Sequence, residues 1–258
     1  MSQYLISVLA CLLLFVSMPV IAGFGHRVGR RLLHCDENAK ELSTGTVDAA
    51  ILSLLGLLTA FTFSSAYSRY DARRLLIVEE ANAIGTAYLR LDLLPEDRQP
   101  ALRNKFREYV ASRSELWRLL PSRDAALAAY ERCEKWQQAI WEDAVDATRG
   151  ETLGDARKLL LPALNEMIDI TTTRLVAIQS HPPLIIFLLL GLLSLAASWI
   201  VGFGMAKSAR LSYAHVFGFA AMASLALYVI LDIEYPRYGL ITLDTPHKLL
   251  EDLLQSMR

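Results

Sequence analysis

Hydrophobic residues gather in four long runs along the chain, at approximately 4–24, 49–68, 184–203 and 211–231. Each run is long enough to cross a hydrocarbon core of about 30 Å as a helix that rises about 1.5 Å per residue. The hydrophilic stretch 69–181 separates the second run from the third and holds most of the charged residues. The pattern predicts a membrane protein with four transmembrane helices and one inserted hydrophilic domain.

The second and third apolar runs have no break on the side facing the hydrophilic stretch. From Arg69 to Leu94 there is no proline and only one glycine, and apolar residues recur at helical spacing. The same spacing fills 160–178 and leads to the pair Pro182-Pro183. We therefore expect transmembrane helices 2 and 3 to extend into the domain, with Pro162 marking a kink or a first turn.

Two further amphipathic helices are expected inside the domain, with apolar faces within 102–120 and 129–144. Ser122 is the expected N-cap of the second, and Gly150 its stop. The fold class is thus an all-α membrane protein with a helical-bundle extramembrane domain. The expected parts are transmembrane helices 1 and 2 at 1–68, the extramembrane domain at 69–181, transmembrane helices 3 and 4 at 182–233, and a C-terminal tail with a short amphipathic helix at 234–258.

Composition narrows the function classes. The chain is 53% hydrophobic, and its 26 basic residues balance 27 acidic ones, whereas a nucleic-acid surface needs an excess of basic residues. Three scattered cysteines do not suggest a disulfide framework. No glycine-rich phosphate loop, CxxC pair or HExxH motif is present, and the five histidines lie in separate segments. We expect no enzyme activity, cofactor or metal, and we interpret Glu79-Glu80 and Glu142-Asp143 as solvated helix faces.

Polar residues inside the second apolar run follow one side of the predicted helix. At about 100° per residue the four hydroxyl residues fall within about 60° of one another, and two bulky apolar residues fall on or next to the same face. The stripe consists of Thr46, Ser53, Leu57, Phe61, Ser64 and Ser68. It suits a pore lined by the same helix from several subunits, with Leu57 and Phe61 as a hydrophobic constriction. The alternative is that the hydroxyls only permit close helix packing and bond to their own helix.

Three carboxylates lie near the ends of apolar runs, where they can stay hydrated. Asp48 begins the second run, and Asp232 and Glu234 follow the fourth. They are candidates for an ion-attracting ring, or they cap helices.

The segment 60–70, AFTFSSAYSRY, resembles the second transmembrane helix of bestrophins. In that register the three apolar residues of the bestrophin neck fall on Ser53, Leu57 and Phe61, of which Ser53 departs from the pattern. A closer similarity is to bacterial bestrophin-like membrane proteins of unknown function. It rests on Arg69-Tyr70-Asp71-Ala72-Arg73-Arg74, Glu79-Glu80-Ala81-Asn82-Ala83-Ile84, Leu94-Pro95, and on Asp232, Pro236, Gly239 and Pro246 in the tail.

The resemblance implies a homo-oligomer, with five subunits if it holds in full, that conducts inorganic ions across a lipid bilayer. We therefore expect a passive ion channel in a bacterial inner membrane. The alternative is a non-conducting sensor or scaffold whose helical domain binds a partner.

The orientation in the membrane follows from the basic residues near the spans. Arg27, Arg30, Arg31 and Lys40 follow the first run, and the N-terminus before it has no charged side chain. Because basic loops stay in the cytoplasm, this count favours a periplasmic domain. Arg69, Arg73 and Arg74 oppose it, and the bestrophin resemblance implies a cytoplasmic domain.

Overall fold

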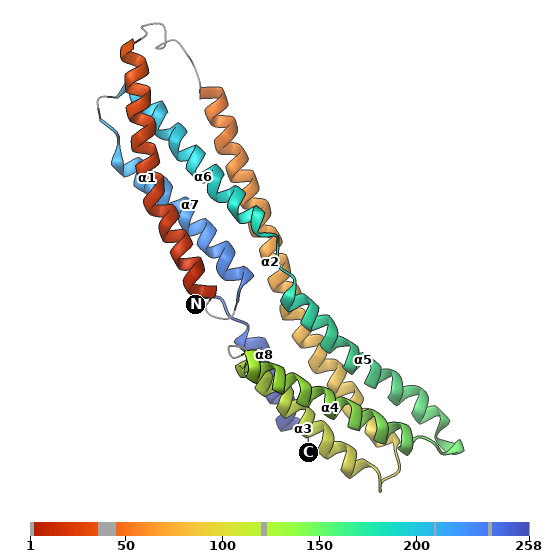
Figure 1. Cartoon of the computed structure of the whole chain (residues 1–258). Coiled ribbons are helices and arrows are strands. Elements are labelled where there is room, and N and C mark those ends of the chain that lie inside the picture. The colour runs from red at the N-terminus through yellow and green to blue at the C-terminus, as the bar shows by residue number, and fades with distance from the viewer. Residues whose placement is uncertain (1–2, 36–44, 120–122, 209, 237–238, 258) are drawn as a thin grey trace. The chain divides into compact units, whose positions relative to one another are not determined.

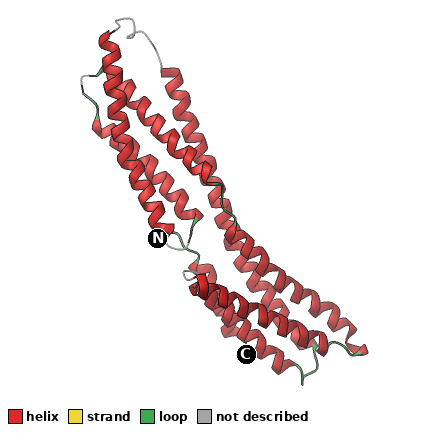
Figure 2. Cartoon of the chain, viewed as in Figure 1, coloured by secondary structure: helices red, strands yellow, loops and turns green. Residues whose placement is uncertain are grey.

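The computed structural model describes residues 3–35, 45–119, 123–208, 210–236 and 239–257. Ser122 and Lys40 lie outside these residues. Within the described ranges the chain forms helices joined by short connections, with no strand, as Figures 1 and 2 show. The expected all-α class is confirmed. The chain divides into two compact units, Met1–Tyr70 with His181–Thr242, and Asp71–Ser180 with Leu243–Arg258.

The first unit, here the membrane unit, contains the apolar helices. It holds α1 (Gln3–Cys35), the first part of α2 (Gly45–Leu89), α6 (Leu184–Gly204) and α7 (Tyr213–Glu234). In the described residues, four helical segments that include these elements are long and apolar enough to cross a membrane. The four predicted spans are therefore present, and the protein is a membrane protein.

Small residues allow α1 and α6 to pack closely in the membrane unit (Figure 1). A Cβ added at Gly202 would collide with the backbone of Ala22, so the two helices meet backbone against backbone. Ser198 donates a hydrogen bond of 2.7 Å to the carbonyl of Met18 on the neighbouring helix. Close approach through small residues with an interhelical hydrogen bond is a common way to join helices in lipid.

The second unit, here the helical domain, contains the rest of α2, α3 (Gln99–Leu119), α4 (Arg123–Ala147), α5 (Gly154–Gln179) and α8 (Asp244–Ser256). Its core consists of residues that the amphipathic patterns placed inward, joined by two residues of the C-terminal segment. The fully or almost fully buried members include Ile84, Leu91, Leu102, Phe106, Tyr109, Ile140, Leu160, Leu164, Met167, Leu250 and Met257. The predicted C-terminal amphipathic helix thus packs into this core.

Two connections follow from local sequence. α2 runs from Gly45 to Leu89 without a break, because no proline interrupts it. α5 ends at Gln179 and α6 begins at Leu184, with extended backbone at Ser180 and at Pro183 between them. The proline pair thus separates the two helices, since a residue before proline is disfavoured in helical conformation. Pro162 lies well inside α5, not in its first turn.

Candidate functional site

One face of α2 packs inside the membrane unit and the opposite face is open. Leu55, Thr62 and Ala66 are buried. Leu57 and Phe61 are 52% and 62% exposed, and at about 100° per residue they point roughly opposite to the buried side. The predicted constriction residues therefore lie on a face of α2 that this chain does not cover.

The other predicted lining residues share this exposure. Thr46, Ser53, Ser64 and Ser68 are all exposed, and Asp48 is half-buried. By contrast, Thr59 and Thr62 point toward the packed side and donate hydrogen bonds of 2.7 Å to the carbonyls of Leu55 and Leu58. Thr59 and Thr62, whose hydroxyls bond to their own helix, are thus not part of the predicted stripe.

Among the four candidate spans, α2 is the least covered. In its most apolar stretch 11% of the residues are buried, against 22% to 39% in the other three spans. A helix with so little intrachain packing has most of its surface available to lipid or to other protein.

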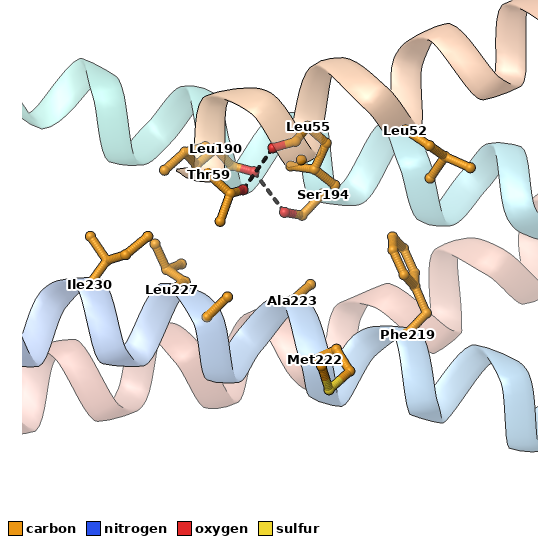
Figure 3. A pocket seen from close by; sticks show the side chains of 12 residues that line it. Leu52, Leu55, Thr59, Leu190, Ser194, Phe219, Met222, Ala223, Leu227 and Ile230 are labelled. Carbon is orange, nitrogen blue, oxygen red and sulfur yellow. Dashed lines mark hydrogen bonds between the residues drawn. The ribbon is translucent and has the colours of Figure 1, made fainter. Parts of the chain in front are cut away.

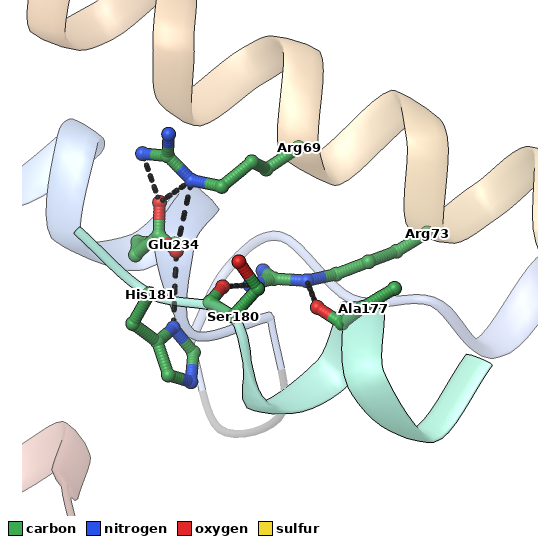
Figure 4. Close-up of polar contacts among 6 residues, drawn as sticks. All are labelled: Arg69, Arg73, Ala177, Ser180, His181 and Glu234. Carbon is green, nitrogen blue, oxygen red and sulfur yellow. Dashed lines mark hydrogen bonds and ion pairs between the residues drawn. The ribbon is translucent and has the colours of Figure 1, made fainter. Parts of the chain in front are cut away.

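Glu234, at the end of α7, is committed to contacts within the membrane unit. Its carboxylate is fully buried. Arg69 donates to Oε2 from Nε at 2.9 Å and from Nη2 at 2.7 Å, and to Oε1 from Nε at 3.2 Å (Figure 4). His181 places Nδ1 3.0 Å from Oε1, and its ring lies 4.6 Å from that of Tyr235. The buried carboxylate thus connects the middle of α2, the C-terminal end of α7 and the segment before α6.

Asp232 has a comparable structural role. It is buried, and one carboxylate oxygen accepts backbone hydrogen bonds of 3.0 Å from both Leu240 and Ile241. A Cβ at Gly239 would collide with this carboxylate, so a larger residue there would push the carboxylate away from these two hydrogen bonds. Both carboxylates make hydrogen bonds within the membrane unit, and their part in an ion-attracting ring stays a prediction.

Arg73 closes the C-terminal end of α5 inside the helical domain. Its Nε donates to the carbonyl of Ala177 at 3.0 Å, and its Nη2 donates to that of Ser180 at 2.8 Å (Figure 4). Carbonyls at a helix C-terminus have no intrahelical partner, and a cation there is also stabilised by the negative end of the helix dipole. Arg73 thus fixes the end of the helix that precedes the proline pair.

Glu80 corrects the interpretation of the Glu79-Glu80 pair as a solvated face. Glu79 is exposed, but Glu80 is fully buried, and it lies 2.6 Å from Nε of Arg113 and in contact with Arg174. Burial lowers the pKa of Arg174 to about 10, so this guanidinium is still charged at neutral pH. The available signal was helical spacing, because Glu80 lies three residues after Ile77 and four before Ile84, both of them buried.

Side chains of the types that ligate metals are dispersed in the part of the chain that the structure describes. No group of three or more His, Cys, Asp or Glu side chains that could hold a metal occurs among the described residues. Cys133 is free and buried in the helical domain, where burial raises the pKa of its thiol. A thiol with a raised pKa has little of the reactive thiolate form at neutral pH.

Fold and exposed face together define an all-α membrane protein with four helices able to span the bilayer and a helical extramembrane domain. A model of one family, described as the Bestrophin-like domain, matches residues 11–245. The chain belongs to this bestrophin-like family.

Solved structures show the same fold. A bacterial bestrophin homologue from Klebsiella pneumoniae, phased with zinc, aligns at a TM-score of 0.68 and 17% identity over 97% of each chain. A tryptophan-to-alanine variant of the Klebsiella pneumoniae homologue aligns at a TM-score of 0.71 and 15% identity, over 100% of this chain and 98% of the other. No curated protein matches the sequence.

Proposed function

We propose that the chain is one subunit of a homo-oligomeric ion channel, with α2 lining the pore. One observation carries the proposal: Leu57 and Phe61 are bulky apolar side chains that lie exposed on the side of α2 opposite its packed face. A single α2 cannot enclose a hydrated path. Several copies around an axis would bring these faces together, and membership of the bestrophin-like family supports that arrangement.

In this proposal Leu57 and Phe61 form the gate. A narrow apolar ring offers ions no replacement for their hydration shell, so it holds back ions and water until it widens. Thr46, Ser53, Ser64 and Ser68 line the path on either side with hydroxyls. Asp48 attracts ions at one end, whereas Asp232 and Glu234 hold the end of α7 through their buried contacts.

The test is ion flux into liposomes containing the full chain. Leu57→Ala combined with Phe61→Ala is expected to raise the flux of Na⁺, K⁺ or Cl⁻, because smaller rings wet more readily. Ser64→Ala is expected to change conductance or selectivity only modestly. The matched control is Leu58→Ala with Phe63→Ala, which removes the same side chains about 100° or more from the centre of the stripe.

The alternative, a non-conducting anchor, expects no flux from any variant. A stable and correctly assembled Leu57→Ala/Phe61→Ala protein with flux no higher than empty liposomes refutes the gate assignment. Equal flux from the control pair points to loosened helix packing and refutes it as well.

A further inference from the structure

The membrane unit contains a partly open apolar cavity of about 320 Å³ between α2, α6 and α7 (Figure 3). Its walls include Leu52 and Gly56 from α2, Ser194 from α6, and Ala226 and Leu227 from α7. An enclosed apolar cavity of about 150 Å³ binds benzene, so this partly open space is large enough to hold part of an apolar molecule.

The polar groups of the wall are already satisfied. Thr59 donates a hydrogen bond of 2.7 Å to the carbonyl of Leu55, and Ser194 donates one of 2.8 Å to that of Leu190 (Figure 3). A buried water needs two to four polar partners, and these hydroxyl protons are committed to their own helices. The cavity therefore suits an apolar occupant and not an ion or a polar solute.

Small residues create the space. Gly56 lines the cavity, and a Cβ added to it would meet nothing within 4 Å. Ala226 faces the cavity from the other helix. Larger side chains at these two positions would fill the space from opposite walls without colliding with the backbone at Gly56.

We propose that this cavity binds an acyl chain of a membrane lipid. Its wall reaches Met222, which is 70% exposed, so the cavity continues into the apolar surface that faces the hydrocarbon phase. Leu55 and Thr59 point roughly opposite to Leu57 and Phe61 at about 100° per residue. The acyl chain thus lies behind α2, on the side away from the proposed pore face, and its binding does not depend on ion conduction.

The experiment uses the full chain in phosphatidylcholine vesicles that contain a phosphatidylcholine with a photoreactive diazirine in its acyl chain. The protein is extracted in mild detergent to remove loosely held lipid, irradiated, and mapped by peptide mass spectrometry. Label is expected on the peptides that contain Met222 and Leu227. Gly56→Leu and Ala226→Leu, made separately, each fill part of the cavity. Each is expected to reduce this label by about tenfold, because the affinity for the acyl chain falls by about the same factor.

Gly218→Leu is the matched control, since Gly218 is exposed, a Cβ there also meets nothing within 4 Å, and it does not line the cavity. It should keep the wild-type label. The proposal is overturned if the wild-type protein carries no label on these peptides after extraction, as expected if a second copy of the chain fills the space. It is also overturned if both filling variants keep the wild-type label, or if Gly218→Leu loses as much as they do.

Discussion

Glu80 is a buried carboxylate of the helical domain whose charge two buried cations share. Arg113 and Arg174 are 6% and 7% exposed, and Glu80 is 0% exposed between them. Glu80→Gln preserves the shape of the side chain and removes its negative charge. Two buried guanidiniums then lose the carboxylate that they share at the contact between α2, α3 and α5.

The magnitude follows from the cost of a buried charge that has lost its partner. Removing one member of a buried ion pair costs about 3–5 kcal/mol, and glutamine retains an acceptor oxygen, so about 3 kcal/mol is expected. Because about 1.4 kcal/mol is a factor of ten, this loss makes global opening of the domain about 100-fold more frequent.

Amide hydrogen exchange of the full chain in lipid nanodiscs measures this opening without requiring reversible unfolding. The buried amides of α3 and α5 are expected to exchange about 100-fold faster in Glu80→Gln. Glu79→Gln is the control, because the neighbouring residue is exposed and its loss should change exchange less than about threefold. Replacement of all three charged residues by apolar ones, Glu80→Leu, Arg113→Met and Arg174→Met, is expected to restore most of the protection.

The reasoning is refuted if Glu80→Gln changes exchange by less than threefold, or if Glu79→Gln accelerates it equally. Either result would mean that the buried charges are not coupled as the distances indicate.

Three further predictions concern assembly, orientation and packing. The purified protein in mild detergent is expected to have the mass of a homo-oligomer, five subunits if the bestrophin resemblance holds in full, and a monomer in both detergent and native membranes would contradict the channel proposal. Cys133 is buried with a raised pKa, so the reporter is Asp155→Cys in a background of Cys35→Ala and Cys133→Ala, which removes the native thiol after the first span. Labelling by an impermeant maleimide in intact cells indicates a periplasmic domain, and labelling only after lysis a cytoplasmic one. Gly202→Ala should lower the thermal stability of the membrane unit because its Cβ meets the backbone of Ala22, whereas Gly218→Ala, in open space, should not.

Long apolar runs and helical periodicity were sufficient to predict the fold class. The spans and the unbroken α2 depend on local properties, namely helix length, apolar content and the absence of proline, which can be read directly from neighbouring residues. The buried faces of α3 and α5 were predictable for the same reason, since Leu102, Phe106 and Met167 recur at helical spacing.

Partners far apart in sequence were not predictable. Glu234 appeared as an interfacial carboxylate because its cation, Arg69, lies 165 residues away, and no spacing rule connects the two. Glu80 was masked by its exposed neighbour, since adjacent acidic residues usually indicate a solvated face. The acyl-chain cavity had no sequence signal either, because it arises from side chains that are absent at Gly56 and small at Ala226.

Each unit combines an early and a late stretch of the chain, so neither unit can finish folding until its late stretch has been synthesised. Arg69 is made 165 residues before Glu234. At roughly 5–20 residues per second, the carboxylate is therefore synthesised about 10–30 s after the guanidinium. The helical domain is also completed late, because Leu250 and Met257 enter its core from the C-terminal segment. Both units therefore reach their final packing only after nearly the whole chain has left the ribosome, and in the interval α2 must be held in the membrane without its ion pair.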